Sequence, residues 1–309
     1  MKHSLIAYLI VLLALVSCRG GETTHPSSPA LKLSYAERID EEHLSLLGGN
    51  YDRIAVDASV YKGLMDMLGV GNKCIDFSQN MKLDVEKVIA AKPDLLLLSA
   101  YEGSDVEKFK KMGIPIVECT DFLETSPLAR AEWMRFFGRL WGVGEKADSL
   151  FASVEKNYKN LCDDSDNTKT VFFDLIYGNI WYQPSPLSTI GQLVFDAGGS
   201  IPFEINQVGG SLSLSVEQVL LQAKDADFWL IRANSNQQLS LESLAKMNPA
   251  YSQFKAFKKG NVFVCYTDKT NYFEDSPFRP DWLLEDFRAI ISPSTAKGRV
   301  ELRYFRKIK

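Results

Sequence analysis

The chain has 309 residues, of which 46% are hydrophobic and 24% are charged, and its formal net charge is −4. These proportions are those of an ordinary soluble globular protein, and a chain of this length favours two lobes over a single domain. Because binding to nucleic acid depends on basic patches that face phosphate, the acidic balance gives no reason to expect nucleic acid as a partner.

The first 17 residues have the pattern of an export signal. A short basic start at Lys2 is followed by an unbroken apolar run of 12 residues from Leu5 to Val16. A membrane-spanning helix needs about 20 apolar residues, so this run is too short to cross a bilayer and fits the core of a signal peptide. The sequence Leu15-Val-Ser-Cys18 resembles a bacterial lipobox, with Cys18 as the lipidated residue. An ordinary signal peptide followed by an incidental cysteine is the alternative.

Residues 18–30 are predicted to form a flexible tether behind the lipidated cysteine. The stretch contains Gly, Thr, Ser and Pro and almost no apolar side chain, so it cannot bury enough surface to become ordered. We expect a periplasmic protein that is anchored to the membrane only through the lipid on Cys18. The sequence leaves open which leaflet holds the anchor.

From Arg53 onward, apolar runs of strand length alternate with amphipathic stretches of helical length. In the first half, the predicted strands are residues 53–58, 95–99 and 114–119, and the predicted helices are residues 61–68, 83–91 and 106–112. Two long helices follow at 130–140 and 145–161. In the second half, we predict strands at 170–176, 228–232 and 261–266 and helices at 189–196, 216–222 and 281–291. This alternation is typical of parallel sheets that are covered by helices.

The two halves resemble each other. Leu83-Asp-Val-Glu-Lys-Val-Ile89 leads into the strand at 95–99, and Leu214-Ser-Val-Glu-Gln-Val-Leu220 leads into the strand at 228–232, at an offset of 214 − 83 = 131 residues. We therefore predict an α/β protein with two similar lobes, each with a mainly parallel central sheet, joined by one long linker helix. The predicted parts are an N-terminal lobe at 31–144, the linker helix at 145–162 and a C-terminal lobe at 163–309. Chance similarity between common helix-strand units is the alternative.

Several segments resemble one protein family in their order and spacing. The stretch from Leu83 to Leu98 is similar to the helix-then-strand signature of periplasmic binding proteins for cobalamin, ferric siderophores and haem. Met112-Gly-Ile-Pro-Ile-Val117 and Ile190-Gly-Gln-Leu-Val-Phe-Asp-Ala-Gly-Gly199 are similar to further parts of its pattern. Pro127-Leu-Ala-Arg-Ala-Glu-Trp133 resembles a version found in lipoproteins of Bacteroidetes. The resemblance implies a monomer with a ligand cleft between two lobes, which docks on the permease dimer of an ABC importer.

Ligands of open α/β sheets bind beyond the carboxyl ends of the strands. Aromatic and arginine side chains recur there, and they offer flat apolar contact with polar tips and donors for carboxylates or phosphates. Core packing of the aromatic residues and surface ion pairs of the arginines are the structural alternatives. The predicted ligand-binding residues are Tyr61, Tyr101, Arg130, Trp181, Tyr182, Arg232, Tyr272, Phe273 and Arg279.

The resemblance also implies one surface carboxylate in each lobe for docking on the importer. Glu102 is the candidate in the N-terminal lobe, by its position just after a strand, and Glu242 is the weaker candidate in the C-terminal lobe. A helix cap explains Glu102 as well, and a solvated glutamate at a helix start explains Glu242.

The sequence predicts neither an enzyme nor a resident cofactor or metal. Only His25 and His43 follow the signal segment, which is too few for a catalytic relay and for a zinc site. Gly209-Gly-Ser-Leu-Ser213 lacks the second glycine of a nucleophile elbow. A surface lipoprotein that binds a glycan or a partner protein without an importer is the alternative function, and a hydrolase is a more remote one.

The sequence does not select among a corrinoid, a ferric siderophore and haem as the ligand. We favour a corrinoid slightly because aromatic pairs occur at Trp181-Tyr182 and Tyr272-Phe273. A tyrosine phenolate can ligate haem iron, and Tyr61, Tyr101 and Tyr272 are the candidates.

Three features are left without an assigned role. Four cysteines follow the predicted anchor; buried thiols are the simpler interpretation and disulfides are the other, and the residues are Cys74, Cys119, Cys162 and Cys265. Residues 31–50 are interpreted as an added hairpin. The tail after Pro293 is basic and has no predicted place in the fold.

Overall fold

The computed structural model describes residues 31–79, 82–99, 108–162, 167–204, 210–235, 237–293 and 301–309. Residues 31–309 form one compact unit. The predicted signal peptide, Cys18 and the tether lie outside the described residues. Across the described ranges, no helix has both the length and the apolar character needed to span a bilayer.

The first sheet is parallel and has the strand order β2-β1-β5-β6. Its strands are β1 (Ile54–Val56), β2 (Cys74–Asp76), β5 (Leu95–Ser99) and β6 (Ile116–Cys119). All of β1 and the four leucines of β5 are buried, as expected of strands that are covered on both faces. The helices α2 (Ala58–Leu68) and α3 (Val85–Ala91) belong to this half, with a small ribbon of β3 (Ser78–Gln79) and β4 (Lys82–Leu83).

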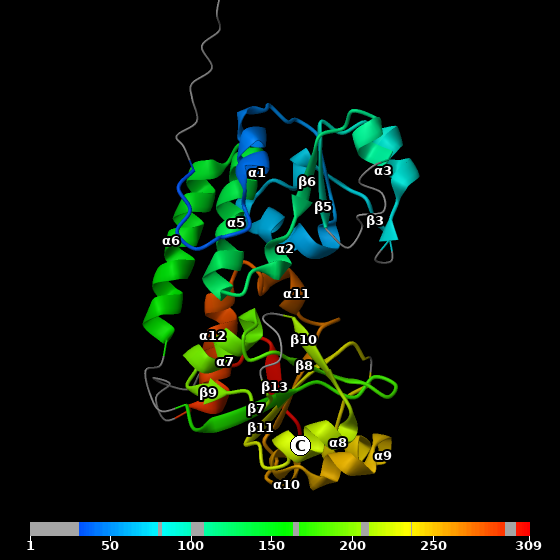
Figure 1. The fold of residues 1–309 in the computed structure, drawn as a ribbon, viewed down its shortest axis with the longest axis vertical. Coiled ribbons are helices and arrows are strands. Elements are labelled where there is room, and N and C mark those ends of the chain that lie inside the picture. The colour runs from blue at the N-terminus through cyan, green and yellow to red at the C-terminus, as the bar shows by residue number, and fades with distance from the viewer. Residues whose placement is uncertain are drawn as a thin grey trace, which may run out of the picture. The chain divides into compact units, whose positions relative to one another are not determined.

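Two long helices, α5 (Pro127–Leu140) and α6 (Gly144–Leu161), follow the first sheet (Figure 1). Ser126 caps α5 by accepting a hydrogen bond from the backbone N–H of Ala129, and proline occupies the first turn, where no N–H is needed. A Cβ atom on Gly138 would lie 2.3 Å from the Cβ of Ala147, so glycine at this position lets α5 and α6 pack closely.

The second sheet has the strand order β13-β12-β11-β7-β9. Its parallel strands are β7 (Lys169–Phe173), β9 (Gly199–Ser200), β11 (Phe228–Ala233) and β12 (Val262–Tyr266). A separate antiparallel pair consists of β8 (Trp181–Pro184) and β10 (Ser211–Leu214). The helices of this half are α7 (Thr189–Asp196), α8 (Val216–Ala223), α9 (Leu241–Met247), α10 (Lys255–Lys258), α11 (Tyr272–Asp275) and α12 (Pro280–Ile291).

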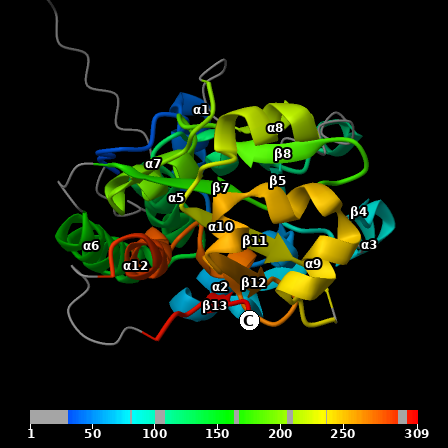
Figure 2. The same cartoon turned by 90° about the horizontal axis from the view of Figure 1, so that it is seen from below.

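The predicted fold class, α/β with two mainly parallel sheets, is therefore confirmed. Seen from below, α6 and α12 lie side by side, and they also contact each other, so the long helix after the first sheet packs on a helix of the second half (Figure 2). The amide of Asn157 on α6 donates a hydrogen bond of 3.3 Å to Asp281 on α12.

Residues 31–50 do not form a hairpin, which corrects the expectation from the sequence. They form an extended strap followed by the short helix α1 (Glu41–Ser45). The strap is held by Glu132 of α5, whose buried carboxylate accepts hydrogen bonds of 2.7–3.0 Å from the backbone N–H groups of Ser34, Tyr35 and Ala36. Arg135 also donates to this carboxylate, at 2.8 Å. One buried charge thereby satisfies three backbone donors of the strap.

The basic tail also has a place in the fold. Its strand β13 (Phe305–Lys307) pairs antiparallel with β12 at the edge of the second sheet. The buried carboxylate of Asp286 accepts hydrogen bonds of 2.7–3.1 Å from three consecutive backbone N–H groups, those of Arg303, Tyr304 and Phe305. Charged side chains on an edge strand oppose pairing with another chain.

Replacing Glu132 by alanine should destabilise the compact unit strongly. The substitution removes the acceptor of the strap's hydrogen bonds and leaves Arg135 without one of its two carboxylate partners, which costs roughly 3–5 kcal/mol in the free energy of unfolding. Chemical denaturation of wild type and Glu132→Ala measures the difference. Glu145→Ala, which changes an exposed glutamate in the first turn of α6, is the matched control and should stay within about 0.5 kcal/mol. Equal stability of Glu132→Ala and wild type would contradict the role given to the strap.

Candidate ligand-binding site

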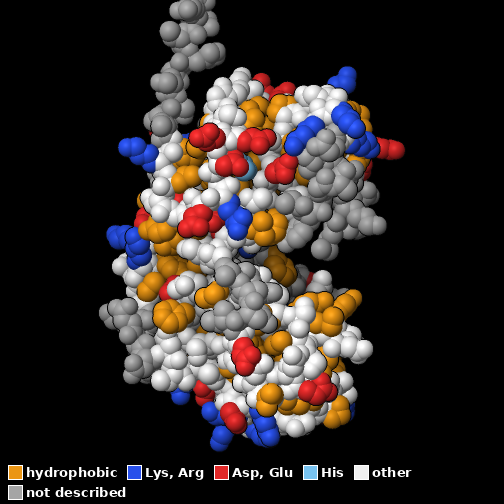
Figure 3. Space-filling view, viewed as in Figure 1, with side chains coloured by type: hydrophobic (Ala, Val, Ile, Leu, Met, Phe, Trp, Pro, Cys, Tyr) orange, Lys and Arg blue, Asp and Glu red, His pale blue; other side chains and the backbone are white. Residues whose placement is uncertain are grey.

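The carboxyl ends of the two sheets are brought together by a contact between α2 and α11. A Cβ atom on Gly63 would lie 2.4 Å from the carbonyl oxygen of Glu274, so only glycine allows α2 to approach the α11 backbone this closely. Next to this contact, the rings of Tyr61 and Phe278 have their centroids 6.2 Å apart. The space-filling view shows a hollow between the parts of the molecule that carry the two sheets (Figure 3).

On the side of the first sheet, Asp121 links two of the predicted site residues. Asp121 follows β6 and is almost completely buried. Its carboxylate accepts a hydrogen bond of 3.0 Å from the hydroxyl of Tyr61 and one of 3.1 Å from Nε of Arg130. Burial, and then the charge of Asp121, raise the pKa of Tyr61 well above its usual value, so this tyrosine is a neutral donor.

On the side of the second sheet, Asp174 has the corresponding role for Arg232. Asp174 follows β7 with a φ of +56°, in the left-handed region that aspartate tolerates better than most residues. Its carboxylate binds the guanidinium of Arg232 through both oxygens, with Nε at 3.1 and 3.2 Å. Burial alone would lower the pKa of Arg232, but the neighbouring Asp174 outweighs it and raises that pKa.

Hydrogen bonds also fix the main chain of Asp174. Its carbonyl oxygen accepts hydrogen bonds from the indoles of Trp181, at 3.1 Å, and Trp229, at 2.9 Å. Its backbone N–H donates to the carbonyl of Leu230, at 2.8 Å. Residues held in sparsely populated backbone conformations often mark ligand sites, and here the surrounding bonds fix that conformation.

Trp181 was expected to contact the ligand, and the structure corrects this expectation. Its side chain is fully buried in an aromatic cluster with Trp229, Tyr251 and Phe254. The reason is the alternation of side chains along β8, which points Trp181 into the core and Tyr182 outward. Trp181 therefore supports the site from within.

Exposed aromatic and apolar side chains accompany these polar clusters. Tyr182 and Phe273 are exposed, as the prediction of ligand contact requires, at 44% and 54%. The chain before β8 adds Tyr177, which is 81% exposed, and Ile180, which pairs with it in an isolated bridge. Tyr177 and Ile180 are not among the predicted ligand-binding residues.

Tyr272 and Arg279 are less available for contact with a ligand than the sequence predicts. Tyr272 is buried, and its hydroxyl has no hydrogen-bond partner among the described residues. Burial raises the pKa of Tyr272 to about 12, although the charge of Arg232 opposes the rise. Arg279 donates to both carboxylate oxygens of Asp281, at 2.8 and 2.6 Å, and lies 3.6 Å from the ring centroid of Trp282. This geometry favours the ion-pair alternative for Arg279 over ligand contact.

Tyr101 and Glu102 lie outside the described residues. Glu242, in the first turn of α9, is 78% exposed and forms a surface ion pair of 2.6 Å with Lys246. Its use in docking stays a prediction. Cys74, Cys119, Cys162 and Cys265 form no disulfide with one another. Within the described ranges, no group of three His, Cys, Asp or Glu side chains is placed to hold a metal ion.

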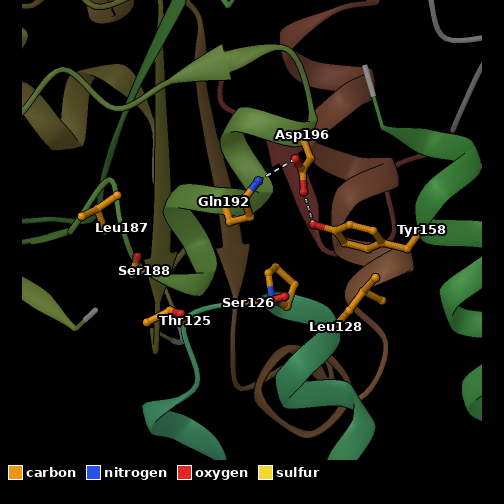
Figure 4. Close-up of a pocket in the computed structure, with 9 residues that line it drawn as sticks. Thr125, Ser126, Leu128, Tyr158, Leu187, Ser188, Gln192 and Asp196 are labelled. Carbon is orange, nitrogen blue, oxygen red and sulfur yellow. Dashed lines mark hydrogen bonds between the residues drawn. The ribbon is translucent and has the colours of Figure 1, made fainter. Parts of the chain in front are cut away.

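A cavity of about 350 Å³ lies between the start of α5, α6 and α7 (Figure 4). On one side of it, Asp196 accepts hydrogen bonds from the hydroxyl of Tyr158, at 2.5 Å, and from the amide of Gln192, at 2.7 Å. Ser126 and Ser188, which cap α5 and α7, line the other side. None of the predicted ligand-binding residues lines this cavity.

Two mainly parallel sheets with aspartate-held arginines after their strands have the architecture of a solute-binding protein. Residues 40–268, well over half of the chain, match the sequence profile of the family described as periplasmic binding protein. The chain belongs to this family. Since it is a family of binding proteins, membership agrees with the expectation that the chain is not an enzyme.

Individual relatives are distant. An uncharacterised lipoprotein of Methanocaldococcus jannaschii is 28% identical over 77% of this chain, which spans only 57% of that relative's length. The iron-uptake system-binding protein of Bacillus subtilis is 23% identical and is matched over 87% of this chain and 92% of its own length. A crystal structure of a periplasmic haem-binding protein from Pseudomonas aeruginosa has a TM-score of 0.64 at 14% identity, covering 84% of this chain and 99% of that one. These organisms give no support to the predicted Bacteroidetes type.

Substitutions at two neighbouring positions of β8 should have opposite consequences. Trp181→Ala removes a buried side chain and its hydrogen bonds and should lower the free energy of unfolding by roughly 3–5 kcal/mol. Tyr182→Ala removes an exposed ring and should change it by about 0.5 kcal/mol or less. Urea denaturation of both variants measures the difference. A stable Trp181→Ala protein would contradict the core position of this residue.

Proposed function

We propose that this chain is the ligand-capturing subunit of an ABC importer, outside the cytoplasm and held at the membrane by the lipid on Cys18. Its ligand is a bulky metal chelate, which binds between the carboxyl ends of the two sheets. The observation that carries the proposal is the occurrence of exposed aromatic side chains, Tyr182 and Phe273, together with two partly exposed arginines, Arg130 and Arg232, that aspartates hold at those ends. Large apolar contact with a few fixed donors is what a bulky, partly polar ligand requires.

Relatives support an iron chelate or haem as the ligand. One relative is named for iron uptake and one similar fold for haem binding. The buried hydroxyls of Tyr61 and Tyr272, whose pKa values are raised by burial, are poor iron ligands in this conformation. Haem would then be held by flat contact on the exposed rings, or through Tyr101. A corrinoid fits the same exposed aromatic side chains and remains a candidate ligand.

A glycan-binding lipoprotein is the second candidate function. It is favoured by the strong exposure of Tyr177 beside Tyr182, since sugars stack on accessible aromatic rings as well. The arginines held by Asp121 and Asp174 give less support to it, because an uncharged sugar does not need two guanidinium groups.

Calorimetric titration of residues 31–309 with haemin, cyanocobalamin and several ferric siderophores tests the proposed ligand class. We expect one-to-one binding of at least one chelate. Tyr182→Ala and Phe273→Ala should each weaken it about tenfold, which corresponds to about 1.4 kcal/mol of binding free energy. Leu221→Ala, which changes an exposed leucine of α8, is the control and should bind as wild type does. A folded protein that binds no chelate but binds an oligosaccharide would move the glycan function to first place.

Docking on the importer is tested separately from ligand capture. Glu242→Arg should leave the affinity for the ligand unchanged, because the side chain lies on the exposed first turn of α9. It should lower uptake through the reconstituted importer several-fold, since opposed charges across an interface cost binding energy. Glu217→Arg, a reversal of an exposed glutamate in the first turn of α8, is the matched control. Unchanged uptake with Glu242→Arg would remove this residue from the docking surface.

A further inference from the structure

The arginines at the carboxyl ends of the strands share one feature, which is that an aspartate holds each of them. Arg130 is bound to Asp121, Arg232 to Asp174 and Arg279 to Asp281. The three aspartates are much less exposed than solvent-facing carboxylates, and two of them, Asp121 and Asp281, are almost completely buried. At this edge, each arginine therefore supplies guanidinium donors, while its aspartate balances its positive charge.

The two clusters still leave donors for a ligand. Asp121 binds Arg130 through Nε, so that the terminal nitrogens of this arginine have no other partner among the described residues. Asp174 binds Nε and one terminal nitrogen of Arg232, and the side chain of Tyr272 interacts with the same guanidinium group. The side chains of Arg130 and Arg232 are 25% and 22% exposed. Each aspartate therefore fixes its arginine while part of the guanidinium stays accessible.

Other charged side chains near this edge carry both signs, and Arg303 lies over the same Trp282 ring as Arg279. Lys269, after β12, is exposed and has Asp268 beside it in the chain. Glu274 and Asp275 of α11 add two carboxyl groups at the contact with α2. Burial of Asp275, and in second place repulsion by Glu274, raise the pKa of Asp275.

We propose that Asp121 and Asp174 are positioning residues that hold Arg130 and Arg232 as neutral ion pairs, so that the site selects chelates of low net charge and rejects trianionic ones. This inference rests on the proposed function and narrows its ligand class. A guanidinium that is already neutralised donates hydrogen bonds to ligand oxygen atoms at fixed geometry. A trianionic chelate would gain little Coulomb energy from it and would be repelled by the aspartate behind it.

The test compares ligands of similar size and different charge. The full chain, purified in detergent, is titrated with an uncharged ferric trihydroxamate, cyanocobalamin, haemin and a trianionic ferric tricatecholate. Wild type should bind at least one low-charge probe about tenfold or more tightly than the trianion. Binding of the trianion as tightly as any low-charge probe would overturn the proposal. Binding of no probe by the folded chain would remove the proposed function itself, and the inference with it.

Asparagine variants then test the two aspartates. Asp174→Asn keeps the side-chain shape and tolerates the left-handed backbone. It should shift the affinity ratio toward the trianion by about tenfold and weaken binding of the low-charge probe, because the charge of Arg232 is no longer balanced and its side chain loses its fixed position. Asp121→Asn should shift the ratio in the same direction and tests the proposal independently should Asp174→Asn fail to fold.

A matched control separates selectivity from stability. Asp227 forms a similar ion pair with Lys255, at 2.9 Å, but precedes β11 and so lies at the opposite end of the strand that carries Arg232. Asp227→Asn should leave the ratio of affinities unchanged. Equal losses for all probes in Asp174→Asn and Asp121→Asn, with the ratio unchanged, would show a purely structural role for both aspartates and would overturn the proposal.

Discussion

The candidate ligand-binding site depends on the backbone conformation and the contacts of Asp174, which follows the end of β7. Its left-handed backbone turns the chain at the carboxyl end of the strand, its carbonyl receives the indoles of Trp181 and Trp229, and its carboxylate holds Arg232. One residue thereby joins the second sheet, the β8 strand and Arg232. A partly buried carboxylate is costly unless it has hydrogen-bond partners, and here the main chain and the guanidinium of Arg232 supply them.

On the side of the first sheet, a different aspartate holds the arginine at this interface. Asp121 stands after β6 and joins Tyr61 of α2 to Arg130 of α5. The close approach of α2 to α11 at Gly63 joins the two halves of the chain at these carboxyl ends. The proposed recognition surface is consequently assembled from side chains that lie far apart in the sequence, and its donors are positioned before any ligand arrives.

The long periodic elements were predictable because each carries a strong local signal. The strand at 95–99 and the helix at 189–196 have the same bounds in the structure as in the prediction. The β8–β10 pair and β13 were missed, since short strands rich in serine, proline or basic residues lack an apolar run. Trp181 was misassigned for the same reason, because an unrecognised strand hides the alternation that buries it. The partner role of Asp174 was hidden by a strand predicted to continue to residue 176, and no sequence pattern pairs it with a residue 58 positions away.

We propose that a low-charge chelate binds between the two carboxylate-held arginines. The most direct measurement is a crystal structure of the protein with the chelate that binds most tightly in titration. We expect the ligand to touch Tyr182 or Phe273 and to accept hydrogen bonds from Arg130 and Arg232, while both arginines stay paired with Asp121 and Asp174. A ligand seated instead in the cavity beside Tyr158 and Asp196, or an Arg232 that has left Asp174 to bind it, would contradict this mode of binding.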